Sequence, residues 1–501
     1  MKKIILIINF LVPALLCSQD TQDNKGNVWI LGFLTDILKE QVQMNFNGDS
    51  LEVQPFIGTS SMADPSLSSI SDQAGDLVLY TNGCQILNNS HTVIEGGDSL
   101  AIDFDPGLCE LVGFAGTIDG TLLLPQPCDE NKVNLITDET VVIDFTISTF
   151  NLYNTEIDIT DKDNPVVIEK QAVILHDTLA PGNVYATRHV NGRDWWVCTM
   201  ETVSNCFKCL LLNEQGFSEP VRSCTGPLWS FMMDSPIWGE DSGVGGFSPD
   251  GSTYVRFNSI VGLNVYDFNN ENGLMEHRER ILFDEDDFLG YVGASISPNS
   301  RFLYASAKHR LYQFDLWADD IRSSGKIVAT HDTSVPGNPT FRISRIASDN
   351  KIYVVGLNSL IGFHVIHNPD LEGEACNVEQ LGFRLPEGIA HLGGLPNNPW
   401  YGATPDNSPC DSLLSATTDP VKLIPLIDVY PNPTQNYLNI SSPDDLHITR
   451  TELLDLQGTA HTLVHENTSQ VRLDLSGYPA GLYFVSIHTE KGSVVKKVVV
   501  E

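Results

Sequence analysis

Short hydrophobic runs alternate with polar turns along most of the chain, a pattern typical of β-strands and unlike the 3.6-residue period of helices. At seven places, mostly about 50 residues apart, a polar turn stands directly before a β-rich run. The turns end at Gly26, Gly75, Gly120, Gly192, Gly251, Ser300 and Asn350. The pattern predicts a repeat of several short strands over the greater part of the chain.

Such a repeat indicates the blades of a β-propeller. One small sheet cannot cover its own apolar faces, so it packs against neighbours around an axis, and closing the ring leaves only short edges. The clearest turn, Ser248-Pro-Asp-Gly251, resembles the repeats of TolB-like and WD40-like propellers. We therefore expect an all-β protein: a seven-bladed β-propeller followed by a small C-terminal antiparallel β-sandwich.

The first blade is expected to be built from both ends of the body. Gly26 stands at the turn between the first and second strands of this blade, and the runs at 28–33, 42–46 and 51–56 supply the second to fourth strands. Too few residues precede Gly26 to form the first strand after a signal peptide is cleaved. The segment 389–395 is the natural donor of that strand.

The longest interval between turns runs from Gly120 to Gly192 and contains extra strand-like runs at 142–145 and 166–173. It holds either one long blade or a hidden eighth blade. We favour the long blade.

The N-terminus is typical of an exported protein. Lys2 and Lys3 precede an apolar stretch at 4–16 that is too short to span a bilayer, as in a cleaved signal peptide. A lipoprotein signal at Cys17 is less favoured because the bulky Leu16 precedes it. No later stretch is apolar enough to cross a membrane. The expected divisions are a signal peptide at 1–18, the propeller at 19–400, a Pro/Ser/Thr-rich linker at 401–424 and the C-terminal domain at 425–501.

The formal net charge is −35. Nearly all of it lies in the body, so nucleic acid and anionic lipid surfaces are expected to repel the protein. We interpret the charge as a solubility adaptation of an exported protein. Cation binding or cationic partners are the alternative.

The segment 425–501 has short alternating strands separated by Asn-Pro, Gln-Gly and Pro-Ala-Gly turns, which predict the β-sandwich. Its motif residues are Tyr430, Pro431, Asn432, Pro433, Gly458, Gly481, Tyr483, Lys496 and Lys497. This segment resembles the type A C-terminal sorting domain of Bacteroidetes proteins exported by the type IX secretion system. The resemblance implies Sec export through the periplasm, recognition by the translocon and removal by a C-terminal signal peptidase. The protein would then be secreted or held at the outer-membrane cell surface.

Export permits disulfide bonds. Cys198 and Cys209 flank a turn on adjacent strands, so we expect them to pair. Cys376 and Cys410 bracket the end of the body, where a bridge would clamp the closing strand. A zinc site is less favoured, since a second CxxC is missing. Its ligands would be Cys198, Cys206, Cys209 and Cys224.

The common catalytic motifs are missing from the sequence, including GxSxG, HExxH, the P-loop and GxGxxG. No catalytic residue, metal or cofactor is therefore assigned. The acidic run at 284–287 has the charge to attract Ca²⁺ but lacks the spaced ligands of a calcium loop. His364 and His367 are interpreted as incidental surface or rim histidines, because residues three apart on a strand face opposite sides.

Segments that join one blade to the next should gather on one face of the ring. The segment at 224–242 is rich in aromatic and acidic residues. Its candidate ligand-binding residues are Trp229, Trp238, Asp234, Glu240 and Asp241. Aromatic rings beside carboxylates suit sugars or an aromatic-anchored protein contact, while ordinary packing of the blade ends is the alternative.

These observations favour an extracellular propeller that binds a glycan, peptide or protein ligand. The alternative is a propeller hydrolase or lyase with an active site on the axis, where several blades would contribute residues that sequence spacing does not reveal.

Overall fold

The computed structural model describes residues 24–402 and 427–500, apart from gaps at 33–39, 48–49, 59–61, 63–65, 101–108, 110–116, 140, 144–145, 229–243, 259–260, 284–291, 336, 357–360, 390, 392, 444–445, 455–459 and 490–491. The chain divides into two compact units, Met1–Ser408 and Pro409–Glu501, called here the body and the tail. Apart from single turns of 3₁₀-helix and an isolated helical residue, the described elements are strands, as the alternating pattern predicts.

The described part of the body contains seven antiparallel sheets, each formed by strands that follow one another along the chain. In chain order they are β1 (Val28–Leu31), β2 (Glu40–Asn47) and β3 (Ser50–Ile57); β4 (Ser68–Ser71), β5 (Leu77–Thr81) and β6 (Ile86–Asn88); β7 (Thr121–Gln126), β8 (Asp129–Asp138), β9 (Val141–Ile143), β10 (Thr146–Asp158) and β11 (Val166–Leu179); β12 (Tyr185–Arg188), β13 (Trp195–Met200), β14 (Cys206–Asn213), β15 (Gly216–Phe217) and β16 (Val221–Cys224); β17 (Val244–Phe247), β18 (Thr253–Asn258), β19 (Gly262–Asn269) and β20 (Leu274–Ile281); β21 (Gly293–Ile296), β22 (Phe302–Ala307), β23 (Arg310–Asp315) and β24 (Lys326–Thr330); and β25 (Ser344–Ile346), β26 (Ile352–Val354), β27 (Gly362–Ile366) and β28 (Val378–Arg384).

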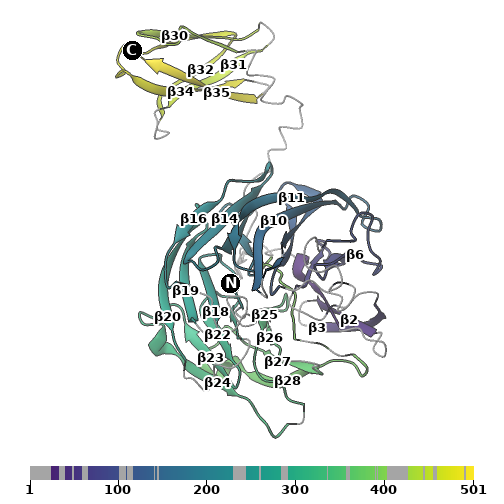
Figure 1. The fold of residues 1–501 in the computed structure, drawn as a ribbon. Helices are drawn as coiled ribbons and strands as arrows, with labels where there is room; N and C mark the ends of the chain where they lie inside the picture. The colour runs from purple at the N-terminus through teal and green to yellow at the C-terminus, as the bar shows by residue number, and fades with distance from the viewer. Residues whose placement is uncertain are drawn as a thin grey trace, which may run out of the picture. The chain divides into compact units, whose positions relative to one another are not determined.

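Figure 1 shows these sheets arranged around a central axis, with β25 near the centre and β28 at the rim. Successive sheets share buried apolar clusters, and the last sheet shares one with the first. At that junction the Trp29 ring packs edge-on against Phe46 at 4.8 Å and against Tyr353 of β26 at 5.7 Å. The body is therefore a closed β-propeller whose N-terminal and C-terminal sheets pack together.

The long interval after Gly120 belongs to one sheet. Strands β10 and β11 continue the order β7-β8-β10-β11, while β9 pairs with the first residues of β10. The extra strand-like runs are thus additional strands of this sheet. The long blade favoured from the sequence agrees with this order.

The turn at Gly120 differs in phase from the turns at Gly75, Gly192, Gly251, Ser300 and Asn350, which lie between the first and second strands of their sheets. The Thr121 hydroxyl donates to the Ser66 carbonyl (2.8 Å), and the Leu123 N–H donates to the Ser68 hydroxyl (3.0 Å), so β7 lies beside β4, the first strand of the preceding sheet. Gly120 therefore precedes the strand nearest the axis, whereas Gly75 and Gly251 follow theirs. The sequence at Asp119-Gly120 nevertheless resembles that of the other turns, because Asp119 also lies in a turn and adopts a left-handed conformation (φ 54°).

The segment 389–395 does not supply the expected strand among its described residues. Ile389 and Leu395 are buried in the same apolar cluster as β1, so the segment does pack at the predicted place. Gly393 has a φ of 110°, and an added Cβ there would lie 2.4 Å from the Gly356 carbonyl oxygen. This backbone conformation interrupts an extended strand.

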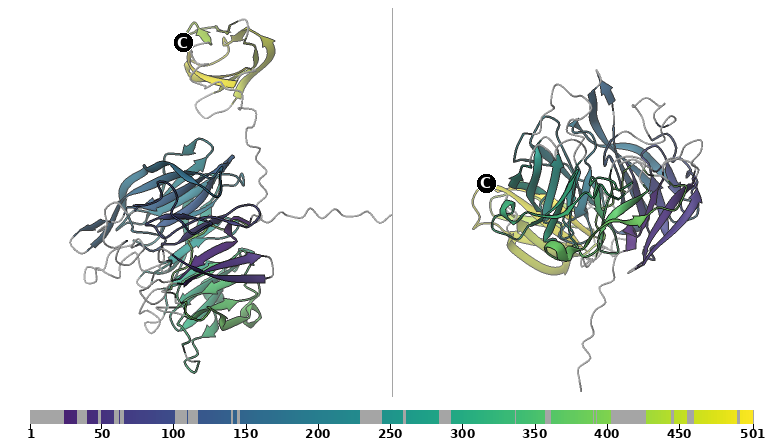
Figure 2. Two further views of the ribbon diagram at one scale, coloured as in Figure 1. Left: turned by 90° about the vertical axis from the view of Figure 1, so that its right-hand side faces the viewer. Right: turned by 90° about the horizontal axis from the view of Figure 1, so that it is seen from below.

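The tail forms its own β-sandwich (Figure 2). One sheet has the order β29-β30-β33 and the other has the order β32-β31-β34-β35. The strands are β29 (Asp428–Tyr430), β30 (Tyr437–Ser441), β31 (Ile448–Leu454), β32 (Ala460–Thr468), β33 (Gln470–Asp474), β34 (Gly481–Thr489) and β35 (Gly492–Val500). Alternate residues of the two sheets, among them Leu438, Leu453 and Val485, fill the core between them.

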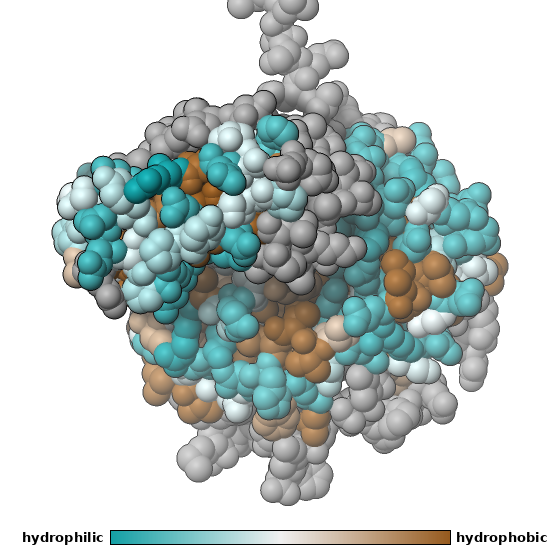
Figure 3. All heavy atoms as spheres, turned by 90° about the horizontal axis from the view of Figure 1, so that it is seen from above, coloured by the Kyte–Doolittle hydropathy of each residue, from teal (hydrophilic) through white to brown (hydrophobic). Residues whose placement is uncertain are grey.

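Hydrophilic residues cover most of the described surface in Figure 3, and hydrophobic residues form separate groups on that face.

Candidate functional site

A buried polar cluster lies where the inner strands of the body meet. Asp119 lies two residues before β7, Tyr185 is the first residue of β12, and Arg345 is the middle residue of β25. The Asp119 carboxylate accepts from the Arg345 guanidinium (2.5 Å) and from the Tyr185 hydroxyl (2.6 Å) through the same oxygen. The Tyr185 oxygen in turn accepts from the N–H of Gly245 in β17 (3.0 Å). This axial cluster thus connects four sheets.

The electrostatics of the axial cluster follow from its burial. The Asp119 and Arg345 side chains are only 1% and 10% exposed. Burial, together with the Asp119 carboxylate, raises the pKa of Tyr185 well above its usual range. Burial, the largest single cause, would lower the pKa of Arg345, but the charges and hydrogen bonds of Asp119 and Tyr185 together outweigh it and the pKa is raised. The cluster is therefore a carboxylate–guanidinium pair with a neutral phenol.

The C-terminal end of the body bonds to β7 and to the residues just before β4 and β12, beside this cluster. The Asn397 N–H donates to the Leu67 carbonyl (2.6 Å), and its side-chain amide donates to the carbonyls of Val184 (2.8 Å) and Thr121 (3.0 Å). Tyr401 is buried, and its hydroxyl donates to the Leu123 carbonyl (2.9 Å). The segment 395–402 is thus held by three sheets.

Tyr401 lies within the range that the sequence assigns to the linker, yet its packing makes it part of the body. Its ring packs edge-on against Trp195 at 5.5 Å. A small pocket of about 20 Å³ lies beside it, enough for roughly one water molecule. Gly26, Trp29, Ser348 and Trp400 are among the residues that line this pocket, so both ends of the body meet there.

Two disulfides connect three neighbouring strands of the fourth sheet. Cys198 of β13 lies directly opposite Cys209 of β14, and Cys206 of β14 lies opposite Cys224 of β16. Both pairs form disulfides, with Cα–Cα distances of 4.1 and 3.9 Å. Cys206 and Cys209 point to opposite faces of β14 because they are three residues apart on a strand. The four thiols of the zinc alternative are therefore used in two cross-strand disulfides.

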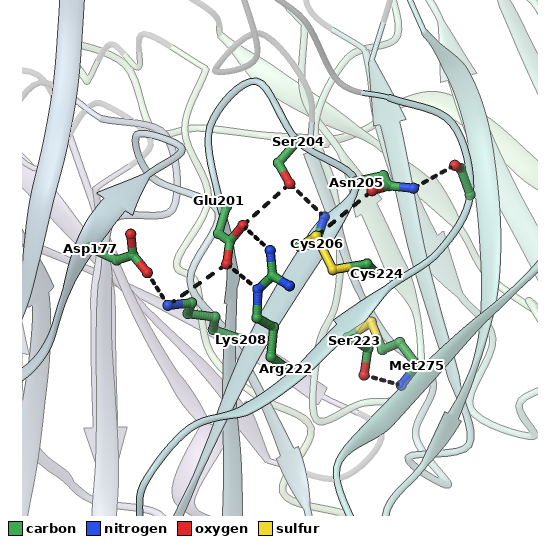
Figure 4. Close-up of a disulfide and its surroundings, with 11 residues drawn as sticks. Asp177, Glu201, Ser204, Asn205, Cys206, Lys208, Arg222, Ser223, Cys224 and Met275 are labelled. Atoms are coloured by element: carbon green, nitrogen blue, oxygen red, sulfur yellow. Dashed lines mark hydrogen bonds and ion pairs between the residues drawn. A yellow bond between two sulfur atoms is a disulfide. The ribbon is translucent and has the colours of Figure 1, made fainter.

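An ion-pair network surrounds the Cys206–Cys224 disulfide (Figure 4). The Arg222 guanidinium donates to both oxygens of Glu201, at 2.6 and 2.8 Å. Lys208 bonds Asp177 and lies 3.7 Å from Glu201. The hydrogen bond from Arg222 holds the pKa of Glu201 below its usual value. These contacts fix the turn between β13 and β14 beside the end of β16.

The other cysteines differ in part from expectation. Cys376 is a buried free thiol, so the predicted bridge from Cys376 to Cys410 is wrong. Cys376 instead packs with Phe302, Tyr304 and Ile366 between the last two sheets of the body. Cys410 lies outside the described residues. A further disulfide joins Cys84 and Cys109, and Cys128 is also disulfide-bonded.

The candidate ligand-binding residues lie outside the described part of the chain. Trp229, Asp234, Trp238, Glu240 and Asp241 all fall within 229–243, and the acidic run at 284–287 is likewise not described. The two flanks of 229–243 are described. On one side Cys224 is disulfide-bonded, and the Asn205 amide donates to the Gly226 carbonyl (3.1 Å).

The opposite flank of 229–243 joins the axial cluster. Gly245, two residues after the segment, donates its N–H to the Tyr185 hydroxyl. Both flanks are therefore fixed by specific contacts, one at the disulfide and one at the axis.

The two histidines of the HxxH sequence have different environments. His364 is fully buried, and its ring nitrogen lies 3.0 Å from the Pro339 carbonyl oxygen. Burial lowers the pKa of His364 to about 4. His367 pairs with Glu379 at 2.8 Å. The interpretation of both as surface residues is thus wrong for His364. Among the described residues, no group of three or more His, Cys, Asp and Glu side chains is placed to hold a metal ion.

Asp138 holds the start of β7 to the loop before β12. Its half-buried carboxylate accepts from the Thr117 hydroxyl and from the Gly182 N–H, both at 2.8 Å. Burial raises the pKa of Asp138 to about 6, although these hydrogen bonds act in the opposite direction. The folded state therefore binds this proton more tightly than the unfolded chain, whose Asp has a pKa near 3.8.

Asp138→Asn is expected to stabilise the body at neutral pH. The stability that the raised pKa contributes is fully present below pH 3.8 and is lost as the pH rises through about 6. The variant should thus match the wild type near pH 4 and exceed it by about 2 kcal/mol at pH 7.5, measured by urea unfolding. Asp315→Asn is a control that should instead lower the stability at neutral pH, because a hydrogen bond from Arg301 lowers the pKa of Asp315. An Asp138→Asn difference that does not change with pH would contradict the assignment.

In the tail, the turn after β29 bonds to the last strand. The Asn432 side-chain amide donates to the Lys497 carbonyl (2.7 Å), and its oxygen accepts from the Val499 N–H (2.9 Å). Tyr430 and Lys497 are exposed, whereas Tyr483 is buried and donates to the Pro479 carbonyl (3.1 Å). Of the other motif residues, Gly481 begins β34, Lys496 lies in β35, and Gly458 lies outside the described residues.

Comparison with known proteins assigns the tail. Residues 428–501 match the family described as the secretion system C-terminal sorting domain. The tail is a type IX secretion sorting tail. The protein is therefore a type IX secretion substrate, exported to the cell surface or beyond. No described helix is both long and apolar enough to cross a membrane.

Several solved structures are distantly similar to this chain. A functionally unknown protein from Desulfotomaculum acetoxidans is 11% identical, with 74% of this chain and 99% of that chain covered and a TM-score of 0.38. A protein from Lactobacillus plantarum is 12% identical, with 75% and 98% covered and a TM-score of 0.39. PorZ, a surface component of the type IX secretion system of Porphyromonas gingivalis, is 10% identical, with 93% and 68% covered and a TM-score of 0.27. No curated protein matches the chain.

Proposed function

We propose that the body is an extracellular binding module, presented by type IX export, and that the segment 229–243 contacts its ligand. The fixed flanks of this segment carry the proposal. The Cys206–Cys224 disulfide holds one flank, and the Gly245–Tyr185 hydrogen bond holds the other. Fixed flanks reduce the conformational entropy that a loop loses on binding, which favours affinity.

The composition of the segment suits a carbohydrate or an aromatic-anchored protein ligand. Trp229 and Trp238 supply large rigid rings, and Asp234, Glu240 and Asp241 supply hydrogen-bond acceptors for hydroxyl or amide groups. The axial cluster has a structural role in this proposal. Its carboxylate already accepts from Arg345 and Tyr185.

The proposal is tested by screening the purified protein against arrays of glycans and of bacterial surface proteins. Trp229→Ala and Trp238→Ala should each weaken binding to the selected array component by about 30-fold, as expected for interface hot spots. Alanine at Asp234, Glu240 or Asp241 should have smaller effects.

Trp317→Ala is the matched control, because Trp317 is 66% exposed and follows β23, away from the segment in sequence. It should bind as the wild type does. If Trp317→Ala weakened binding as much as Trp229→Ala, or if neither Trp229 nor Trp238 mattered, the segment would not be the binding site.

A further inference from the structure

The two disulfides of the fourth sheet differ in exposure. Cys198 and Cys209 are only 3% and 1% exposed, and both belong to a buried apolar cluster shared with the next sheet. In the other disulfide Cys206 is 5% exposed, whereas Cys224 is an exposed residue of β16. Thiol–disulfide exchange requires a thiolate to reach one sulfur of the bond. Of these two bonds, only Cys206–Cys224 therefore offers an external thiol an exposed residue to attack.

The two bonds are otherwise closely matched. Both join directly opposed residues of neighbouring strands, and both involve β14. Their Cα–Cα distances are 4.1 and 3.9 Å. They lie on opposite faces of β14, because residues three apart on a strand point to opposite sides. A difference in their rates of reduction would therefore report on access and not on the pairing of the strands.

An ion-pair network holds the two halves of the Cys206–Cys224 bond together independently of it. Lys208 and Arg222 lie opposite each other, each two residues from a cysteine and thus on the same face as the disulfide. The Arg222 guanidinium donates to both oxygens of Glu201, at 2.6 and 2.8 Å (Figure 4). This contact ties β16 to the turn before β14.

Hydrogen bonds on both sides of Cys224 continue this attachment. The Thr225 N–H donates to the Asn205 carbonyl (2.9 Å), and the Asn205 amide donates to the Gly226 carbonyl (3.1 Å). From the next sheet, the Met275 N–H donates to the Ser223 hydroxyl (3.1 Å). With the S–S bond broken, these contacts would keep the two thiols opposite each other. Groups held in this way have a high effective concentration, which favours re-formation of the bond.

We propose that Cys206–Cys224 is a reversible thiol–disulfide exchange site for small extracellular dithiols, and that Cys198–Cys209 is a permanent structural bond. A thiolate of the dithiol attacks the Sγ of Cys224, and the Sγ–Sγ bond breaks. Its electron pair leaves on the Sγ of Cys206, which takes up a proton.

A second attack completes the exchange. The other thiolate of the dithiol attacks the dithiol's own sulfur in the mixed disulfide, which closes a cyclic disulfide. The Cys224 thiolate is released and takes up a proton. The protein thus gains two electrons and two protons, and the dithiol loses them. The reverse sequence with an oxidised dithiol restores the bond.

The rates of reduction of the two bonds in the folded, full-length protein test this assignment. The protein is exposed to a fixed concentration of dithiothreitol, samples are blocked with iodoacetamide at successive times, and mass spectrometry of peptides reports the labelling of each cysteine. Cys206 and Cys224 should be labelled at least about tenfold faster than Cys198 and Cys209, because the buried pair reacts only when the structure opens. Tryptophan fluorescence should keep its folded value while the first pair is reduced.

The Cys198–Cys209 bond is the internal control, since it shares β14 and the cross-strand pairing. Equal rates for both pairs, or reduction of Cys206–Cys224 only as the folded fluorescence is lost, would overturn the exchange site. Removing dithiothreitol and adding its oxidised form should restore the bond. A reduced pair that does not re-form its bond under these conditions would overturn the reversibility.

Arg222→Ala tests whether Arg222 is a positioning residue for re-formation of the bond. The variant removes the contact with Glu201 but neither cysteine, so re-formation should slow by about two- to threefold, the small effect expected of an ion pair with an exposed arginine. Arg322→Ala is the matched control, because Arg322 is 61% exposed and pairs with Glu279 away from the disulfide (3.0 Å). It should re-form the bond as fast as the wild type.

A wild-type rate of re-formation in Arg222→Ala would overturn the positioning role. None of these measurements uses a ligand of the segment 229–243, so this proposal and the proposed function can fail separately.

Discussion

Replacing Arg345 with alanine is expected to lower the free energy of unfolding of the body by about 3–5 kcal/mol. The variant leaves the Asp119 carboxylate buried without its cation, and Asp119 is only 1% exposed. Tyr185 alone would remain as its hydrogen-bond donor. Loss of one partner of a buried ion pair costs much more than the pair contributes, since the remaining charge has no compensating interaction.

Urea unfolding followed by tryptophan fluorescence measures this effect in the full chain. All seven tryptophans lie before residue 401, so the fluorescence reports on the body and not on the tail. Arg222→Ala is the control, because it breaks an ion pair whose arginine side chain is 54% exposed. It should cost less than about 1 kcal/mol.

A double variant distinguishes the loss of the ion pair from the loss of side-chain volume. Asp119→Leu with Arg345→Met removes both charges while keeping apolar volume, so it should recover much of the stability lost in Arg345→Ala. If Arg345→Ala and Arg222→Ala were equally stable, the Asp119–Arg345 pair would not be a buried interaction.

The repeat could be predicted from the sequence because each sheet of the body is formed by strands that follow one another along the chain. Strands β1, β2 and β3 lie close to the expected runs, and the hairpin between β13 and β14 brings Cys198 opposite Cys209 as its turn predicts. The same hairpin argument, extended by one strand, would have paired Cys206 with Cys224. The sequence left Cys206 and Cys224 without an assigned pairing, with zinc as the less favoured alternative, and a strand turns the two CxxC side chains to opposite faces.

The axial cluster could not be predicted in the same way. Asp119, Tyr185, Arg345 and Asn397 come from distant parts of the chain and meet only when the ring closes. Of these residues only Asp119 belongs to a recognised pattern, the Asp-Gly turn before Thr121, and Asp or Asn residues before strands are common as turn residues. The phase error at Gly120 has the same origin. An Asp-Gly turn looks alike whether it precedes the strand nearest the axis or follows it.

Ending the chain after Gly394 is expected to prevent the body from folding, whereas ending it after Gly402 should not. The shorter chain lacks the buried Leu395 and Tyr401 side chains and the hydrogen bonds of Asn397 to Leu67, Thr121 and Val184. Each buried apolar side chain contributes about 1.5–3 kcal/mol. The loss of three hydrogen bonds, which leaves three buried carbonyls without a donor, costs a similar amount. The sum approaches the whole free energy of folding of a typical protein, about 5–15 kcal/mol.

Circular dichroism and limited proteolysis of the two truncated chains measure the difference. The chain ending at Gly402 should show a cooperative thermal transition and resist protease, and it should not reach the cell surface because it lacks the sorting tail. The chain ending at Gly394 should be degraded and show no transition. A point variant distinguishes the effect of the hydrogen bonds from the effect of chain length. In the chain ending at Gly402, Asn397→Ala removes the donor to the Thr121 and Val184 carbonyls. This variant should lower the free energy of unfolding by about 1–3 kcal/mol. Equal folding of both truncated chains would mean that 395–402 only occupies the axis of a ring that is stable without it.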